Sequence, residues 1–363
     1  MGEKKIDSNS GVQANVGFDF QRNTCIYIFL EKYSALKDQN YFIMLEHYDD
    51  IVFGILNEKS ELAEITTYQA KKSSTTWTTN QLYEIIQKIC NSGVELLKDE
   101  LKKSSSYSQL HHFITNNTVS LDYTCSTSKK TKRFYVNETN ESVKYPDLPV
   151  DCQTNLKKGN AKVTFDKDQL DQFPNLNFSF IDIGRNTKSQ LELLSGKFKT
   201  VFGKLILDHD AARDTFIFNL KGIESTYNMG DQPKLKDVSK RLESAKINEI
   251  LNILTTKNLA LEMCRKKAEK IHDELGINVV DALNFELDFE NSLDHFKDLK
   301  QGEHQKIIKY IESKKPTFVS YTNDVNCIKY LHDDFLKYNS SVLSPTQLKA
   351  AIAAGYYQIL LQK

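Results

Sequence analysis

Short apolar segments separated by polar residues fill the first third of the chain. Residues 41–46, 50–56 and 62–71 are apolar runs of strand length, and the polar NEKSE before the last run is typical of a hairpin connection. We expect these three strands to form a curled antiparallel meander. A fourth strand is predicted at residues 111–115.

Apolar residues at helical spacing lie on both sides of the meander. One helix is predicted from about Asp19 to Leu36, with Asp19 as its N-terminal cap. A second helix is predicted from Leu82 to Leu101, before the run SSSYS, which is expected to be a break. The first 120 residues therefore predict the order helix, three strands, helix, strand.

The middle of the chain has a weaker pattern. Residues 121–160 are polar, contain prolines and are expected to be irregular. Strands are expected at residues 161–165 and 176–183, and residues 189–207 predict a helix that runs into a strand. These segments are expected to extend the first domain.

From Lys236 onward the spacing is helical, with a break expected at Thr255 and Thr256. The predicted fold class is therefore α+β. A domain of mixed helices and strands, with an irregular and β extension, would span residues 1–235, with its core at about residues 11–120, and an all-helical domain would span residues 236–363.

The overall charge restricts how the chain could bind nucleic acid. Its 363 residues include 48 Lys and Arg and 48 Asp and Glu, so the formal charge is zero. A protein that binds DNA through its whole surface is basic, so any DNA contact here must be a local patch. The six cysteines have no CxxC spacing, which favours reduced thiols and a cytoplasmic location. No apolar run approaches the roughly 20 residues of a membrane span.

Carboxylates lie where the predicted strands meet. Glu46 ends the first strand and Asp50 opens the second, while Gln69 and Lys71 share one face of the third. If Asp50 points to that face, Asp50, Glu46 and an oxygen of Gln69 or a neighbouring carbonyl suit Mg²⁺ or Mn²⁺. Lys71 would orient or deprotonate an attacking water, or steady a pentavalent phosphorus. The plainer alternative is that these polar residues only solvate strand ends.

The segments GVQANVGFDFQ, LEHYDDIVF and YQAKK resemble the N-terminal nuclease domain of bacterial anti-phage double-stranded DNA endonucleases. That domain has a PD-(D/E)XK restriction-endonuclease-like core of the Mrr-like branch, in which Gln-x-Lys replaces Glu-x-Lys. The resemblance covers about residues 11–120 and implies a Mg²⁺-dependent DNA endonuclease, a phosphodiester hydrolase.

The resemblance also implies roles for single residues. Carried over to this sequence, the catalytic positions are Gln21, Glu46, Asp50, Gln69 and Lys71, of which Glu46, Asp50 and Gln69 would bind the metal. Asp49 competes with Asp50 as the metal-binding aspartate. Because two of these residues are neutral glutamines, the metal affinity would be modest.

Such nucleases occur in cyclic-oligonucleotide systems (CBASS) and in Lamassu systems. The helical C-terminal region has neither the alternating strands nor the Gly-rich loop expected of a nucleotide sensor, which favours the Lamassu nuclease subunit. There the chain would be an effector that works with an SMC-like ATPase subunit and a small accessory subunit and is activated by release and self-assembly. The alternatives are a CBASS-type nuclease, a restriction endonuclease, and a non-catalytic subunit for DNA binding or assembly.

Further surfaces are predicted outside the catalytic cluster. The candidate DNA contacts are Lys72, Lys129, Lys130, Lys132 and Arg133. Homo-oligomers would form through apolar helix faces that include Leu251, Leu254, Leu259 and Ile271. His111 and His112 are expected to be packing or surface residues, residues 207–214 a helix cap, and residues 264–267 a solvated helix face.

Overall fold

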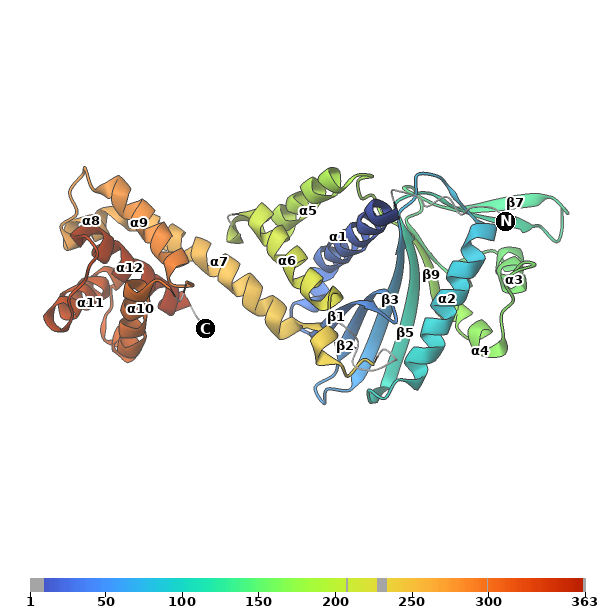
Figure 1. The fold of residues 1–363 in the computed structure, drawn as a ribbon, viewed down its shortest axis with the longest axis horizontal. Coiled ribbons are helices and arrows are strands. Elements are labelled where there is room, and N and C mark those ends of the chain that lie inside the picture. The colour runs from blue at the N-terminus through green and yellow to red at the C-terminus, as the bar shows by residue number, and fades with distance from the viewer. Residues whose placement is uncertain (1–9, 207, 227–233, 299, 362–363) are drawn as a thin grey trace. The chain divides into compact units, whose positions relative to one another are not determined.

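The computed structural model describes residues 10–361, except 207, 227–233 and 299 (Figure 1). The chain divides into two compact units, Met1–Val201 with Asp208–Asn248 and Phe202–Leu207 with Glu249–Lys363. The sequence placed the domain boundary between residues 235 and 236. In the structure the main division follows Asn248, because Leu242 and Glu243 form a strand that pairs with the first strand of the chain.

The first unit contains a seven-stranded mixed sheet, which confirms the expected α+β class. In the order in which they pair, its strands are β10 (Leu242–Glu243), β1 (Asn40–His47), β2 (Asp49–Leu56), β3 (Leu62–Lys71), β5 (Lys103–Thr115), β9 (Leu176–Phe180) and β8 (Ser142–Lys144). The pairs β1–β2 and β2–β3 are antiparallel, as the meander predicted, and β3, β5 and β9 run parallel.

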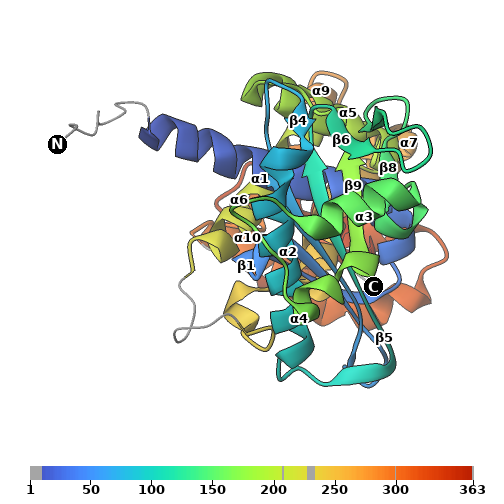
Figure 2. The same cartoon turned by 90° about the vertical axis from the view of Figure 1, so that its right-hand side faces the viewer.

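Helices cover both faces of this sheet (Figures 1 and 2). The helices of the first unit are α1 (Ser10–Leu36), α2 (Thr79–Lys98), α3 (Val150–Lys158), α4 (Lys167–Leu170), α5 (Thr187–Phe202) and α6 (His209–Glu224). α1 and α6 contact β1, and α2 packs on the opposite face. There Phe42, Met44 and Val52, which alternate along the strands, cluster with Leu96 of α2. The predicted order of helix, three strands, helix and strand is observed, with a two-residue strand β4 (Trp77–Thr78) before α2.

Two predicted element starts were wrong. α1 begins at Ser10, and Asp19 lies inside the helix, where its carboxylate pairs with Arg22 one turn later instead of capping. β5 begins at Lys103 and contains the serine run that was predicted to be a break. Pairing with β3, as of Glu64 with Ser108, supplies backbone hydrogen bonds that outweigh the low strand propensity of serine.

Residues 121–160, expected to be irregular, are regular in large part. β6 (Val119–Thr124) and β7 (Thr131–Val136) form an antiparallel hairpin, which joins β4 in a second sheet of three strands. Val119 and Leu121 alternate along β6 and are buried in a cluster with residues of α2. The hairpin therefore has an apolar face despite its polar sequence.

Two expected strands do not form in the described residues. Residues 161–165 follow a turn in which the Asn160 side chain accepts hydrogen bonds from the amides of Lys162 and Val163, both at 2.9 Å. After α5 the chain makes a 3-10 turn, Gly203–Leu205, with Gly203 at φ 53°, in place of the strand expected before residue 207. Leu207 itself lies outside the described residues.

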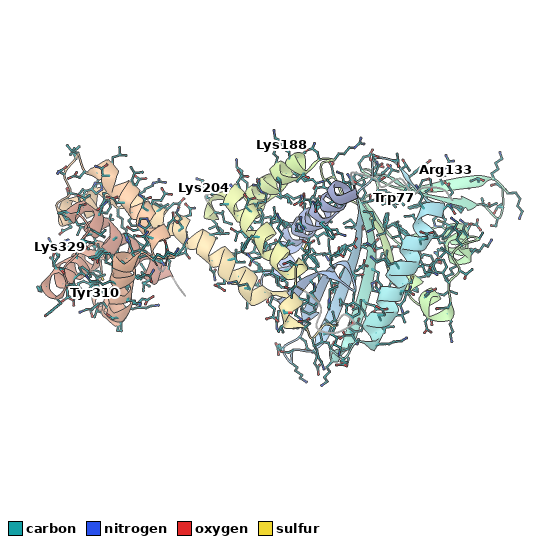
Figure 3. All side chains as sticks on the ribbon, viewed as in Figure 1. Trp77, Arg133, Lys188, Lys204, Tyr310 and Lys329 are labelled. Carbon is teal, nitrogen blue, oxygen red and sulfur yellow. The ribbon has the colours of Figure 1, made fainter. Side chains whose placement is uncertain are left out.

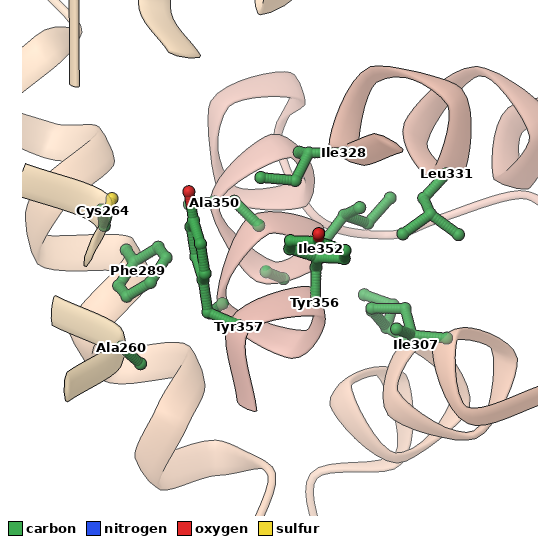
Figure 4. Packing of buried hydrophobic residues seen from close by; sticks show 14 of the residues in the cluster. Ala260, Cys264, Phe289, Ile307, Ile328, Leu331, Ala350, Ile352, Tyr356 and Tyr357 are labelled. Carbon is green, nitrogen blue, oxygen red and sulfur yellow. The ribbon is translucent and has the colours of Figure 1, made fainter. Parts of the chain in front are cut away.

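Helices are the only regular secondary structure among the described residues of the second unit. It contains most of α7 (Ser244–Lys266) and the helices α8 (Ala268–Leu275), α9 (Ala282–His295), α10 (Gly302–Lys314), α11 (Asp324–Tyr338) and α12 (Pro345–Leu361). The α12 sequence is apolar on nearly all sides, so the helix lies in the centre of the core, where Tyr356 and Tyr357 pack among the surrounding helices (Figure 4). No helix among the described residues is both long and apolar enough to span a membrane.

The helical unit also corrects two expectations. α7 continues through Thr255, whose hydroxyl donates to the Leu251 carbonyl at 2.9 Å, so the predicted break is absent. Leu251 and Ile271 are 4% and 0% exposed, because both belong to the interior. They are therefore not available as a contact face between copies, whereas Leu259 is 36% exposed.

Candidate active site

Asp50 and Gln69 lie opposite each other at the ends of β2 and β3. The register pairs Ile51 with Tyr68, so one further step along each strand brings Asp50 to Gln69. Lys71 is two residues beyond Gln69 and shares its face of the sheet. The fold thus brings together the three residues on which the predicted cluster depends.

The Asp50 carboxylate is the centre of this cluster and is only 3% exposed. Its Oδ2 accepts hydrogen bonds from the Gln69 side-chain amide and, at 2.9 Å, from the Ala70 backbone amide. Lys71 Nζ lies 3.3 Å from the same oxygen. Three donors therefore hold the carboxylate in one orientation.

A second lysine, which the sequence analysis missed, reaches Asp50 from α2. Lys88 Nζ lies 3.6 Å from Asp50 Oδ1. One turn later Ser92 Oγ donates to the Tyr48 carbonyl at 2.6 Å, so one side of α2 faces the turn between β1 and β2. In the sequence, the only sign that Lys88 could reach the site is its spacing of four residues from Ser92 beside the apolar stripe of the helix. That spacing is equally typical of a solvated helix face.

The turn that carries the acidic residues has an unusual backbone. Glu46 and Tyr48 have φ of 50° and 67°, in the left-handed region that residues other than glycine rarely adopt. Tyr48 is anchored there by its hydroxyl, which donates to Asp99 Oδ2 at 2.5 Å. The Gln21 side chain of α1 lies beside the Glu46 carboxyl group. The two outer residues of the predicted site are therefore in contact with each other.

Carboxyl groups are crowded at this turn. Loss of solvent and then the neighbouring Asp50 raise the pKa of Glu46. Burial and then Asp50 raise the pKa of Asp49 to about 7. Lys88 acts in the opposite direction on both groups. The site thus has an electrostatic cost that a bound cation would relieve.

Asp49 was the competing choice for the metal-binding aspartate. It is buried, and its Oδ1 accepts a hydrogen bond from the Asp50 amide at 3.0 Å. Successive residues of a strand point to opposite faces, so Asp50 and not Asp49 contacts Gln69 and Lys71. The geometry therefore favours Asp50 as the central carboxylate.

Oxygen atoms suited to a hard cation surround the cluster. Gln21 Oε1 and Gln69 Oε1 are buried and have no hydrogen-bond partner among the described residues. Buried acceptors are rarely left unpaired, and Mg²⁺ takes oxygen ligands of this kind. The described part of the chain has no group of three His, Cys, Asp or Glu that could hold a metal. A metal at this cluster would therefore need a mixed donor set, for which the expected residues are Asp50, Glu46 and the Gln69 amide oxygen.

A hollow of about 340 Å³ opens beside the cluster. Its lining comes from α1 and from the end of β3, and consists of Val16, Gly17, Phe20, Gln21, Ala70, Lys71 and Lys72. Lys72, a predicted DNA contact, therefore shares the hollow with Lys71. Two ammonium groups beside a concave surface suit an anionic group such as a phosphate.

The other predicted DNA contacts lie on the β6–β7 hairpin. Lys129 and Lys130 are exposed just before β7, and Lys132 and Arg133 are exposed on it. Arg133 is labelled in Figure 3. Its Nε lies 3.0 Å from Asp122 Oδ1 on β6. The fold gathers these four cations on one hairpin, in a different sheet from β3, which Lys72 follows.

The remaining polar features have structural roles. His111 is fully buried, its Nδ1 lies 2.9 Å from Thr67 Oγ1, and burial lowers its pKa to about 4. Asp208 caps α6 by accepting a hydrogen bond from the Ala211 amide at 2.8 Å, as expected of residues 207–214.

Comparison of the chain with protein-family models, with curated proteins and with solved structures found no match in any of the three. The chemistry assigned to the site therefore rests on the residues that form it.

Proposed function

We propose that this chain is a metal-dependent double-stranded DNA endonuclease. The observation that carries the proposal is the convergence of Gln69, the Ala70 amide and Lys71 on the buried Asp50 carboxylate, beside a Gln69 oxygen that has no hydrogen-bond partner among the described residues. A carboxylate, an amide oxygen and an ammonium at the ends of adjacent strands are suited to metal-assisted hydrolysis of a phosphodiester.

The arrangement of elements supports a PD-(D/E)XK core, as the resemblance implies. α1, the β1–β3 meander, α2 and the parallel strand β5 follow in the expected order, and Asp50 and Lys71 lie at the ends of β2 and β3. In this proposal β8, β9 and β10 extend the core sheet at its edges.

The residues of the site have separate proposed roles in phosphodiester hydrolysis. Asp50, Gln69 and Glu46 would hold Mg²⁺, which when bound acidifies water and offsets charge on the phosphate. Lys71 orients the attacking water and stabilises charge on the phosphoryl oxygens. The attacking water loses a proton to solvent as its oxygen bonds to phosphorus. The bond from phosphorus to a sugar oxygen breaks, and that oxygen takes up a proton from solvent and leaves as a hydroxyl group. No covalent intermediate with the protein is required.

Cleavage is expected to depend on a hard divalent cation. Supercoiled plasmid should be nicked and then linearised with Mg²⁺ or Mn²⁺, and should remain intact in EDTA. Zn²⁺ should substitute poorly, because the proposed ligands are all oxygens. Gel analysis of plasmid forms measures this directly. Full activity in EDTA would exclude the metal mechanism, and intact plasmid with either cation at every protein concentration would exclude the nuclease.

One observation favours a second candidate, a non-catalytic subunit for DNA binding or assembly. Lys71 and Lys88 already surround Asp50, so the cluster could serve as a structural ion pair. In that case substitution of Asp50 would lower the stability of the fold and leave no cleavage activity to lose. The plasmid assay distinguishes the two candidates.

The biological setting follows from the resemblance alone and stays a prediction. It assigns the chain to a Lamassu-like defence complex with an SMC-like ATPase subunit and a small accessory subunit, and to activation by self-assembly. A gene for such an ATPase beside the gene for this chain would support the assignment. A nucleotide cyclase gene there would favour the CBASS-type alternative.

Lys88 is expected to act as a positioning residue. Lys88→Gln should slow plasmid nicking about tenfold, because it removes a cation 3.6 Å from Asp50 Oδ1 while Lys71 remains. Nicking rates and DNA affinity in EDTA should be measured for Lys88→Gln, for Lys88→Arg and for Lys98→Gln on the same helix. Lys88→Arg should recover most of the rate and Lys98→Gln should match the wild type. A rate for Lys88→Gln equal to that of Lys98→Gln would remove Lys88 from the site.

A further inference from the structure

The helical unit contains a hollow with an excess of basic side chains. The hollow measures about 840 Å³ and lies between the junction of α7 with α8 and the start of α11. Its charged lining consists of Arg265, Lys266, Lys267, Glu269, Lys270 and Asp324, four cations and two anions. The sequence assigned residues 264–267 to a solvated helix face, whereas in the fold Arg265, Lys266 and Lys267 line a concave surface and Cys264 is buried in the core.

The N-terminus of α8 adds to the positive potential of this hollow. Both α8 and α11 begin at its wall, and the N-terminus of a helix carries partial positive charge that acidic residues usually offset. At α11 that charge is offset, because Asn323 caps the helix and Asp324 lies in its first turn. At α8 the arrangement is mostly the reverse. Lys267 precedes the helix without a side-chain cap, and Lys270 follows within the first turn, with Glu269 as the acidic residue. The local cost of these lysines would be offset by a bound anion.

Part of the basic lining already has partners. Lys267 Nζ lies 2.6 Å from Asp324 Oδ2, which also accepts a hydrogen bond from Tyr357, so Lys267 is a fixed part of the wall. Arg265 pairs with Glu286, and Lys266 lies 3.8 Å from Glu262. Among the described residues Lys270 has no ion pair, and it is exposed, as is Lys266. Lys266 and Lys270 are therefore the cations most available to a ligand.

We propose that this hollow binds backbone phosphates of DNA. Its lining contains no aromatic side chain on which a base could stack, so it suits the phosphodiester backbone better than a nucleobase. The identity of the polyanion rests on the proposed function. Because the chain has no net charge, DNA affinity must come from local patches of this kind. The helical unit would then hold the duplex in addition to the residues around Lys71.

Charge reversal tests the proposal in the full-length chain. Lys266→Glu/Lys270→Glu should weaken binding of a short labelled duplex at least about tenfold, and should reduce the slope of log affinity against log salt by about 2. Binding is measured by fluorescence anisotropy in EDTA, so that cleavage does not interfere. The milder Lys266→Gln/Lys270→Gln should give an intermediate loss, and circular dichroism should show an unchanged fold for both.

The matched control is Lys309→Glu/Lys315→Glu, which changes the net charge equally at exposed lysines away from the hollow. It should bind the duplex nearly as the wild type does. Equal loss in both reversed variants would mean that only net charge matters, and would overturn the proposal. Loss of binding to a labelled mononucleotide with DNA affinity unchanged would overturn it as well. A specific loss of DNA affinity in a chain that cuts no plasmid would support this proposal while refuting the nuclease.

Discussion

Asp50→Asn is expected to reduce the nicking of supercoiled DNA by about a thousandfold or more. The substitution keeps the size of the side chain and an oxygen for the Ala70 amide, whose hydrogen bond to Asp50 is 2.9 Å long. It removes the negative charge on which Gln69 and Lys71 converge. The loss should therefore be one of chemistry, visible as a lower cleavage rate at saturating Mg²⁺ with DNA affinity in EDTA retained.

Asp49→Asn is the matched control for this prediction. Asp49 is equally buried and adjacent in sequence, but it contacts the Asp50 amide and not Lys71. It should keep most of the activity, whereas Lys71→Gln should be as inactive as Asp50→Asn. If Asp50→Asn were active and Asp49→Asn inactive, Asp49 would be the metal-binding aspartate instead of Asp50. Wild-type cleavage by both Asp50→Asn and Lys71→Gln would end the assignment of this site.

Acid is expected to destabilise the first unit through its buried histidine. Burial lowers the pKa of His111 to about 4, while an unfolded histidine titrates near about 6.5. As pH falls below about 6.5 the unfolded chain takes up the proton first, so stability present above that pH is lost progressively down to about pH 4. At about pH 5 the loss from His111 alone is about 2 kcal/mol. Burial also lowers the pKa of His112, and that residue acts in the same direction.

His111→Asn isolates this effect. Asn can keep the hydrogen bond to Thr67, but it is smaller than histidine, so the variant should be less stable than the wild type at about pH 7. Because Asn does not titrate, the variant should lose less free energy of unfolding on acidification. The single tryptophan, Trp77, donates to Thr115 Oγ1 of β5 at 2.9 Å, and its fluorescence during denaturant unfolding reports on the first unit. The raised pKa of Asp49 has the opposite effect, because it makes the folded state relatively more stable as pH falls. The difference between the pH profiles of His111→Asn and the wild type therefore isolates the effect of His111. Parallel pH profiles of His111→Asn and the wild type would contradict the prediction.

Periodicity was sufficient for the elements with a clear apolar face. The β1–β3 meander and α2 were predicted because their apolar residues alternate or recur at helical spacing. The β6–β7 hairpin and the first half of β5 were not, because neighbouring strands supply the pairing that their serines and lysines do not favour. α7 was split wrongly at Thr255, whose hydroxyl is satisfied inside the helix.

The candidate site was predictable only where local spacing reflects geometry. Gln69 and Lys71 share a face because they are two residues apart on a strand, and Asp50 joins them through the register of β2 with β3. Lys88 comes from a helix whose position over the sheet is a matter of tertiary packing, so no pattern in the sequence distinguished it. The basic hollow was missed for the same reason, since α11 lies far along the chain from Lys266.

The left-handed backbone at Glu46 and Tyr48 lowers the stability of the fold at a residue that the proposed chemistry requires. Glycine or asparagine would adopt such φ values at lower cost, and each strained residue costs about 1 kcal/mol or more. A chain selected for stability alone would therefore have exchanged Glu46, whose side chain does not belong to the buried core. A survey of stabilising substitutions should find them concentrated at this turn, and engineering the protein for heat resistance would remove the acidic group that the proposed metal needs.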